Sequence, residues 1–399
     1  MEPLICGVLY WPAEVGPFLW DEFDAGRIGA DLAAVRAAGF SVVRLPLAWD
    51  AFMPSPRQVS RRRLRELEMV LDSAAAVSLA VVPVLFAQSW GDCVWLPRYA
   101  VDRRRPRVGV RVISDGNVVA GGPRDLYADP LMLELATTWM DALLRAFAGH
   151  PGIAAWDLGH DPATTVRPRR IAHLAAWVEL LAGRVRGQQE RCWLTLGAGD
   201  VLLGRGVRLA AVAPHLDAVG VSTAPQPPAL PLSETSAGDV TFVLQLAQRL
   251  CDQATPVVML NTGVASEDPE APADGDADAA TETGLAPADA VRVTGAVLER
   301  AVAAGASGLL ALTWCDTGPR TLEAPPFDRA RWLARRGLTA SAAALKPHGM
   351  EWSRLARREP AAAAADPWPP QLDIEEYYAN LPDSARDLRS RWHAERGDE

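Results

Sequence analysis

The residues best placed to do chemistry in this 399-residue chain are polar side chains that directly follow short apolar runs. Residues 153–158 form such a run, and His160 and Asp161 come just after it. In a parallel α/β sheet the carboxyl ends of the strands gather at one edge, where reactive groups are found. A carboxyl group there can act as a general acid or base, which makes Asp161 the first candidate. Asn261 follows a second apolar run, 257–260, but its amide carries no titratable group.

Eight short apolar runs alternate with longer amphipathic stretches, and this alternation predicts an α/β protein, a single (β/α)8 TIM barrel. The runs are rich in Val, Ile and Leu without polar alternation, as expected for strands buried on both faces. The eight expected strands are residues 4–9, 42–47, 80–86, 153–158, 192–196, 218–222, 257–260 and 308–313. We expect the barrel to occupy residues 1–345, with a loop insertion at 98–129.

Two segments fall outside this alternation. Residues 266–286 are rich in Ala, Asp, Glu, Pro and Gly and carry almost no large apolar side chain, which predicts a disordered acidic loop. We expect residues 346–399 to form a linker and a C-terminal helical arm that packs on the barrel. Three aromatic residues of this arm are available for docking: Tyr377, Tyr378 and Trp392.

Composition excludes several classes of protein. Forty Lys and Arg against 49 Asp and Glu give a net charge of −9, which argues against nucleic-acid binding because such proteins present a basic face. No apolar run is long enough to span a bilayer, and the N-terminus lacks a basic leader segment, so we expect a cytoplasmic protein without membrane contact. Five scattered cysteines without metal-ligand spacing predict reduced, buried thiols. The basic run 103–107 is interpreted as a solvated loop rather than an anion site.

The run HPGIAAWDLGHDP at 150–162 resembles the fourth-strand motif of clan A glycoside hydrolases, especially the cellulase- and mannanase-like members of family 5. In that family the strand ends in an Asn-Glu pair whose Glu is the general acid/base, and here the pair is His160-Asp161. Residues 255–263 resemble the family's seventh-strand motif, and the nucleophilic Glu of the family falls on Asn261. The resemblance covers nearly the whole chain. It implies an O-glycosyl hydrolase barrel with a saccharide ligand, no cofactor and no metal.

The resemblance also indicates further residues of a sugar site. Arg44 matches the family arginine that hydrogen-bonds the nucleophile, and a lone arginine in a barrel strand needs a buried anionic or carbonyl partner. Ser222 and Ala224 stand where the sixth strand of the family carries His and Tyr, and Trp314 matches the tryptophan that floors the reacting sugar's subsite. Trp90 is either a cleft wall or packing at the barrel rim. The expected substrate-binding residues are Arg44, Trp49, His160, Ser222, Trp314 and Asp316.

The preferred hypothesis is a non-catalytic, carbohydrate-binding homologue, a pseudoenzyme of this family. A retaining glycosidase needs two carboxyl groups about 5–5.5 Å apart, one acting as nucleophile and the other as acid. The amide of Asn261 removes the covalent step, because it cannot form a glycosyl ester. Asp161 can still hold a proton, but its carboxyl group is set back by one C–C bond relative to Glu.

Two alternatives remain open. The first is an active β-glycosidase, mannanase- or glucanase-like, that uses relocated carboxylates and an inverting geometry. The carboxylates that could pair with Asp161 in this way are Asp316, Asp92 and Glu14. The second alternative takes His160 and Asp161 as metal ligands together with Asp157 or His150. Asp157 itself is interpreted as a structural hydrogen-bonding partner.

Overall fold

The computed structural model describes residues 4–86, 89–223, 233, 235–251, 255–266, 284–340, 344–358, 368 and 372–396, and the structural statements below concern these residues. Ala224 lies outside them, as do most of the acidic segment 266–286 and most of the linker that was expected after the barrel. The disorder predicted for the acidic segment therefore stays a prediction.

All eight predicted strands are present and close into one barrel. They are β1 (Ile5–Leu9), β2 (Val42–Pro46), β3 (Ala80–Val84), β10 (Trp156–His160), β11 (Cys192–Gly197), β12 (Ala218–Ser222), β13 (Val257–Thr262) and β14 (Gly308–Ala311). Each pairs in parallel with its neighbours in the closed order β1-β14-β13-β12-β11-β10-β3-β2. The predicted TIM barrel is confirmed.

The eighth strand differs from its predicted range of 308–313. β14 ends at Ala311, and a new strand β15 (Thr313–Cys315) leaves the barrel to pair with β16 (Gly337–Thr339). The backbone N–H of Gly337 bonds the Asp316 carboxylate at 2.8 Å, and this bond fixes the departure of the chain from the barrel.

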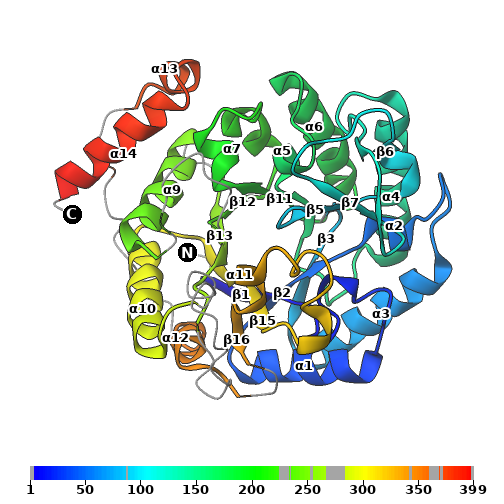
Figure 1. Ribbon diagram of the computed structural model, residues 1–399, viewed down its shortest axis with the longest axis horizontal. Coiled ribbons are helices and arrows are strands. Elements are labelled where there is room, and N and C mark those ends of the chain that lie inside the picture. Colours follow the sequence, from blue (N-terminus) through cyan, green and yellow to red (C-terminus); the bar gives the residue numbers. More distant parts are fainter. Residues whose placement is uncertain are drawn as a thin grey trace.

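Long helices surround the barrel (Figure 1). They are α1 (Ala25–Ala37), α3 (Arg61–Ala76), α4 (Pro130–Phe147), α6 (Ile171–Arg186), α9 (Ala237–Leu250), α10 (Pro287–Ala303) and α12 (Pro347–Ala356). Side-chain caps start several of them: Asp129 accepts from the Leu131 N–H at α4, and Ser60 from Arg63 at α3. Short helices lie between the long ones: η1 (Gly16–Phe18), α2 (Trp49–Phe52), η2 (Arg98–Ala100), α5 (Pro162–Thr165), α7 (Ala198–Leu202), α8 (Leu209–Val212), η3 (Ala213–His215), η5 (Pro319–Thr321) and α11 (Arg331–Ala334).

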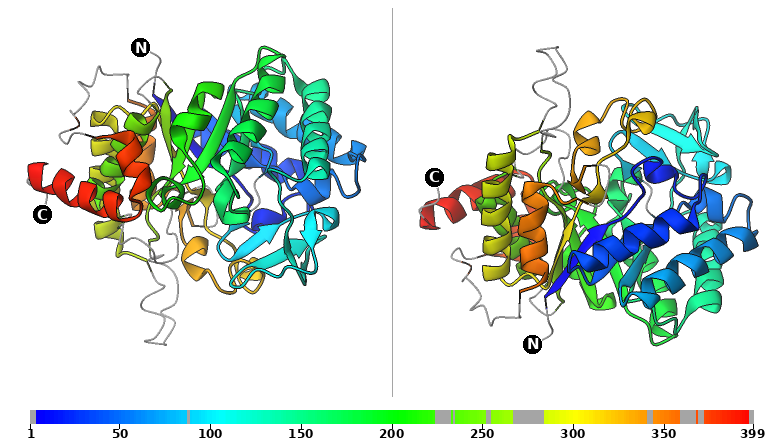
Figure 2. Two further views of the ribbon diagram at one scale, coloured as in Figure 1. Left: turned by 90° about the horizontal axis from the view of Figure 1, so that it is seen from above. Right: turned by 90° about the horizontal axis from the view of Figure 1, so that it is seen from below.

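The insertion after β3 forms a small roof at one end of the barrel. Its four-stranded sheet contains β4 (Ser89–Trp90), β5 (Cys93–Trp95), β7 (Arg111–Ser114) and β8 (Asn117–Val119), and beside it β6 (Val101–Asp102) pairs with β9 (Gly122–Pro123). Arg111 bonds Asp92 within the roof and Asp328 in the loop after β15, at 2.5–2.8 Å. This ion pair joins two segments that Figure 2 shows side by side.

Helices α13 (Ile374–Ala379) and α14 (Asp383–Arg396) lie on the outer side of α9 (Figures 1 and 2). Trp392 of α14 is fully buried and donates to Gln245 of α9 at 2.9 Å, while Arg389 makes a two-pronged ion pair with Asp239 at 2.6 and 2.8 Å. Tyr377 donates to the Val201 carbonyl at 2.9 Å. These contacts dock the arm on the barrel. None of the described helices is both long and apolar enough to cross a bilayer.

Candidate functional site

A cavity of about 630 Å³ opens at the carboxyl ends of the barrel strands, and this volume lies within the range of small-ligand sites. We call it the barrel-mouth cavity. Its floor includes four of the sequence-predicted residues, which are His160, Asp161, Ser222 and Asn261. Its sides come from the roof insertion and from the segment around α11. The sequence motifs of strands four and seven, together with the end of strand six, therefore meet in one site.

Arg44 lies beneath this floor with no exposed surface and is the centre of a buried polar network. Its Nε and one terminal nitrogen both lie 2.8 Å from the Asp157 Oδ2, and the same terminal nitrogen donates to the Thr195 hydroxyl at 3.0 Å. Thr195 in turn donates to Asp157 at 2.6 Å. Asp157 is thus the buried anionic partner that Arg44 was expected to need, and it is not available as a metal ligand.

His160 connects the buried network around Arg44 to Trp90, which lines the cavity. Its ring stacks on Trp90, with centroids 4.6 Å apart and planes 19° apart. Burial, reinforced by the Arg44 guanidinium, lowers the pKa of His160 well below its usual value. A neutral imidazole can accept from Arg44, whose NH1 is 3.5 Å from Nδ1, and can offer an N–H on the other side. Trp90 is therefore a wall of the cavity.

Asp161 and Asn261, which the sequence motifs align with the catalytic carboxylates of family 5, share an unusual backbone conformation. Asp161 has φ 54° and Asn261 has φ 52°, both in the left-handed region that Asp and Asn adopt more readily than other non-glycine residues. The ladder register shifts between Asp157 and His160 in β10, and between Met259 and Thr262 in β13. Bulges of this kind re-aim side chains next to functional sites.

Asp161 lies against a second buried acid, Asp200, at the start of α7. The carboxyl group of Asp200 hydrogen-bonds that of Asp161, and burial together with the Asp161 charge raises the pKa of Asp200 well above its usual value. Gly197 makes this approach possible, because a Cβ at that position would collide with the Asp161 carboxyl. Asp161 in the cavity floor therefore lies against a buried carboxyl that holds its proton more tightly than an ordinary aspartate does.

Asn261 is 2% exposed and is held by one hydrogen bond, from its Nδ2 to the Ser222 hydroxyl at 2.9 Å. Among the described residues its Oδ1 has no hydrogen-bond donor. A buried acceptor without a donor costs on the order of 1–3 kcal/mol, and a ligand hydroxyl would remove that cost. Because Asn261 lines the cavity, its amide oxygen is a candidate ligand acceptor.

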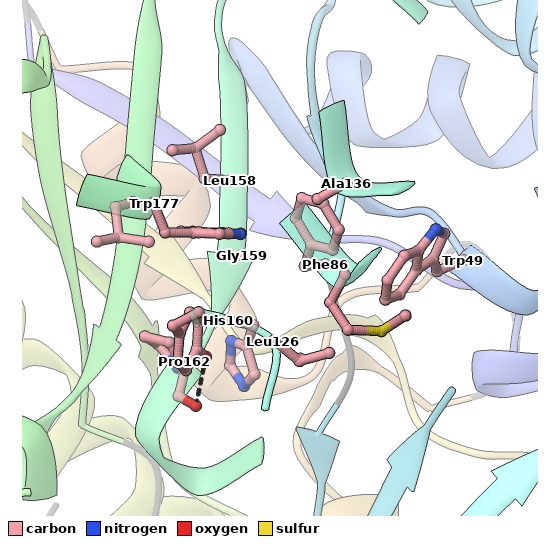
Figure 3. Close-up of a pocket in the computed structure, with 12 residues that line it drawn as sticks. Trp49, Phe86, Leu126, Ala136, Leu158, Gly159, His160, Pro162 and Trp177 are labelled. Atoms are coloured by element: carbon pink, nitrogen blue, oxygen red, sulfur yellow. Dashed lines mark hydrogen bonds between the residues drawn. The ribbon is translucent and has the colours of Figure 1, made fainter. Parts of the chain in front are cut away.

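Three of the expected substrate-binding residues do not line the barrel-mouth cavity. Trp314 is packed in the core edge-on to Phe40, with centroids 6.2 Å apart, so it is not the sugar platform of this cavity. Trp49 lines a separate apolar pocket with Phe86 and Trp177 (Figure 3). Asp316 is buried in an ion pair with Lys346 at 2.5 Å. The binding roles expected for these three residues stay predictions, since none of them is among the residues that line this cavity.

The three carboxylates that could pair with Asp161 in an active enzyme do not all lie at the barrel-mouth cavity. Asp316 and Glu14 do not line the cavity, whereas Asp92 does. Both oxygens of Asp92 accept from Arg111, at 2.8 and 2.6 Å, and one lies 3.4 Å from Arg329. Of the three candidates, only Asp92 faces the same cavity as Asp161.

The metal-site alternative is also contradicted by the placement of its residues. His150 pairs with Asp72 at 3.2 Å, before β10 begins, while His160 is the last residue of that strand and Asp161 follows it. Within the described part of the chain, no group of three His, Cys, Asp or Glu side chains is arranged to hold a metal ion.

Sequence reasoning missed several residues of the cavity and of the network beneath it. Trp332 and Arg205 line the cavity, and Arg107 of the predicted solvated loop lines it as well. Thr195 and Asp200 support its floor from β11 and α7. The run of small residues at 197–199 before Asp200 was the available signal, because it permits close approach of another side chain.

The fold and the site define the class of protein: a TIM barrel whose polar cavity lies at the strand ends, as in glycoside hydrolases. No protein-family model matches the sequence, and no curated protein does either. Solved structures do match. A variant of GH5_18 from Streptomyces cattleya, in complex with Manβ1-4GlcNAc, has 17% identity over 100% of this chain and 92% of its own, with a TM-score of 0.76.

A variant of GH5_18 from Bifidobacterium longum, also with Manβ1-4GlcNAc, has 17% identity over 91% of this chain and 80% of its own, with a TM-score of 0.69. Exo-β-1,4-mannosidase Op5Man5 from an Opitutaceae bacterium has 21% identity and a TM-score of 0.69. The alignment covers 89% of this chain but only 59% of the mannosidase. The predicted resemblance is confirmed at the level of fold: the chain has the same barrel fold as these family 5 structures.

Proposed function

We propose that this protein is a non-catalytic, saccharide-binding homologue of family 5 glycoside hydrolases. The observation that carries the proposal is Asn261, a neutral amide at the position of the family's nucleophile. Ser222 holds that amide in place, so the position is ordered and occupied by a hydrogen-bonding group. An amide at this position binds a hydroxyl but does not attack an anomeric carbon.

The remaining acids support the same proposal. Asp161 hydrogen-bonds Asp200 on its own side of the cavity, whereas a retaining mechanism needs a second carboxylate across the scissile bond. Asp92 is held by Arg111 and Arg329, and these charge-assisted bonds occupy the lone pairs with which it would activate water. The active-enzyme alternative is therefore confined to Asp161 as acid and Asp92 as base.

The cavity offers the groups that a sugar needs. The Asn261 oxygen and the His160 ring can bond hydroxyl groups, while Trp332 can offer the face of its ring that is turned away from Arg336, which lies 4.9 Å from the ring centroid. The GH5_18 neighbours were solved with Manβ1-4GlcNAc or GlcNAc, and we take a β-mannosyl saccharide as the first ligand class to test.

The purified protein is expected to release no product above background from aryl β-mannosides and aryl β-glucosides, because its nucleophile position is an amide. The measurement is chromophore release over long incubation at high protein concentration. Turnover that disappears in Asp92→Asn and persists in the exposed-surface control Asp72→Asn would establish the inverting alternative and contradict the proposal.

Trp332→Ala is expected to weaken saccharide binding about threefold to tenfold, because a stacked ring contributes on the order of 0.5–1.5 kcal/mol beyond the area it buries. Titration calorimetry with β-1,4-mannotetraose measures the loss. Trp332→Phe keeps an aromatic face and should retain most of the affinity. Equal affinities for the alanine variant and the native protein would exclude Trp332 as a platform.

A further inference from the structure

One lip of the barrel-mouth cavity is built from arginines. Arg107, Arg167 and Arg205 all line the cavity, and together we call them the arginine lip. They converge on one short segment: Arg107 donates to the Thr164 carbonyl, and Arg205 donates to the Thr164 hydroxyl at 3.3 Å. Arg167 follows three residues later and donates to the Gly204 carbonyl at 3.1 Å. A chain of net charge −9 thus concentrates positive charge at its cavity.

Arg107 is the residue of the arginine lip whose N–H donors are best placed to bind an anion. Its NH1 bonds the carbonyls of Thr164 and Thr165, and no described carboxylate bonds its Nε or NH2. The Nε–NH2 edge of a guanidinium is a planar fork that matches a carboxylate or a phosphate. Burial, followed by the neighbouring Arg205 charge, lowers the pKa of Arg107, as expected when two cations are held together.

The acids around the cavity offset only part of this charge, since the Arg205 charge acts on the buried carboxyl of Asp200. Burial and the Asp161 charge raise the pKa of Asp200 well above its usual value, so Asp200 is the weaker counter-charge of the two. Asp92 lies between Arg111 and Arg329 in the roof. Arg167 bonds a backbone carbonyl and, among the described residues, no carboxylate. The lip therefore keeps a positive surplus beside the uncharged acceptor of Asn261.

We propose that the cavity binds a saccharide carrying an oxyanion group, a carboxylate or a phosphate ester, on the sugar that faces the arginine lip. This inference rests on the proposed saccharide-binding function and names its ligand class. The Nε–NH2 edge of Arg107 takes the oxyanion in a two-pronged bond, and Arg167 adds charge. Asn261 accepts from a hydroxyl of the same ligand.

The test compares ligands that differ only in the anionic group. β-1,4-Tetramannuronate is matched with β-1,4-mannotetraose, and mannose 6-phosphate with mannose, in calorimetric titrations of the full chain. We expect one anionic probe to bind about tenfold more tightly than its neutral partner, a preference that shrinks as ionic strength rises. The pair that shows the preference identifies the oxyanion as carboxylate or phosphate.

Substitutions in the arginine lip test whether these residues cause the preference for the anionic sugar. Arg107→Gln and Arg167→Gln should each reduce the ratio of the anionic to the neutral affinity. Arg167 is exposed and bonds only one carbonyl, so its variant keeps the test valid if Arg107→Gln fails to fold. Arg104→Gln is the matched control, since Arg104 belongs to the same basic run, is exposed and does not line the cavity.

The outcomes separate the two proposals. Neutral sugars that bind as tightly as the anionic ones would overturn the oxyanion inference and leave the saccharide-binding function standing. A preference that survives both Arg107→Gln and Arg167→Gln would also overturn the inference. A folded protein that binds none of the four probes would contradict the proposed function itself.

Discussion

Arg44→Met is expected to lower the free energy of unfolding by about 3–5 kcal/mol, the usual cost of removing one partner of a buried ion pair. Asp157 would keep its charge at 0% exposure and lose both Arg44 contacts. His160 would lose its guanidinium neighbour, so the cavity floor should also loosen. The measurement is urea-induced unfolding. A lower midpoint urea concentration with an unchanged slope of unfolding free energy against urea reports the loss of stability.

Two further variants isolate the buried charge as the cause. Adding Asp157→Asn to Arg44→Met should recover part of the loss, because the amide can still accept from Thr195 and Gly159 without a charge. Arg62→Met is the control, since Arg62 is largely exposed and Glu66, its partner at 2.7 Å, keeps a second pair with Arg63, so the loss should cost less than about 1 kcal/mol. Equal losses for the buried and the surface arginine would contradict this account of the network.

The combined variant His160→Asn, Asp161→Glu, Asn261→Glu is expected to release product from an activated aryl glycoside, at least roughly a hundredfold above either carboxylate variant alone. Asn261→Glu alone supplies a nucleophile without a correctly placed acid. Asp161→Glu alone supplies the acid without a nucleophile. Because the residues act as one catalytic unit, each single change should be nearly inert.

The structure sets an upper limit on this gain. Both positions have φ above +50°, which a longer acidic side chain tolerates less well than Asp or Asn. The acid at 161 must also share space with Asp200 above Gly197. The control is the combined variant with Asn261→Gln in place of Asn261→Glu, and it should release no product. A combined variant that stays folded, binds saccharide and releases nothing would show that the reacting geometry has been lost along with the residues.

The barrel was predictable because the same pattern, an apolar strand followed by an amphipathic helix, occurs eight times in the sequence and does not depend on the exact ends of each element. Eight buried strands must each be apolar on both faces, and the helices between them must be amphipathic, so small errors in single boundaries do not change the architecture. The fourth strand begins at Trp156 rather than at residue 153, and at the eighth strand Thr313 belongs to β15 rather than to the barrel. The apolar run continues through this point, and nothing in its pattern marks the exit.

The sequence predicted which residues lie at the strand ends, because the order of the strands along the chain determines that, but it did not predict where each side chain points. Strand ends meet at one edge of the barrel, so His160, Asp161, Ser222 and Asn261 were correctly expected to lie together. Order does not determine where a side chain points, and Trp314 turns into the core against Phe40.

The residues that sequence reasoning missed lie on segments without regular periodicity. Arg107 comes from an insertion whose path over the cavity depends on the Arg111 ion pairs between distant loops. Asp200 depends on Gly197 allowing another side chain to approach. Trp332 lies in the segment after the chain has left the barrel. Contacts of this kind are set by tertiary packing, which a local pattern does not report.

The most direct test of the central claim is a single calorimetric titration of the native protein with β-1,4-mannotetraose. A binding site without turnover gives heat that saturates with ligand and then returns to a flat baseline. This is the result we predict. A steady heat flow that persists after saturation and scales with protein concentration would show hydrolysis and contradict the assignment of a non-catalytic cavity.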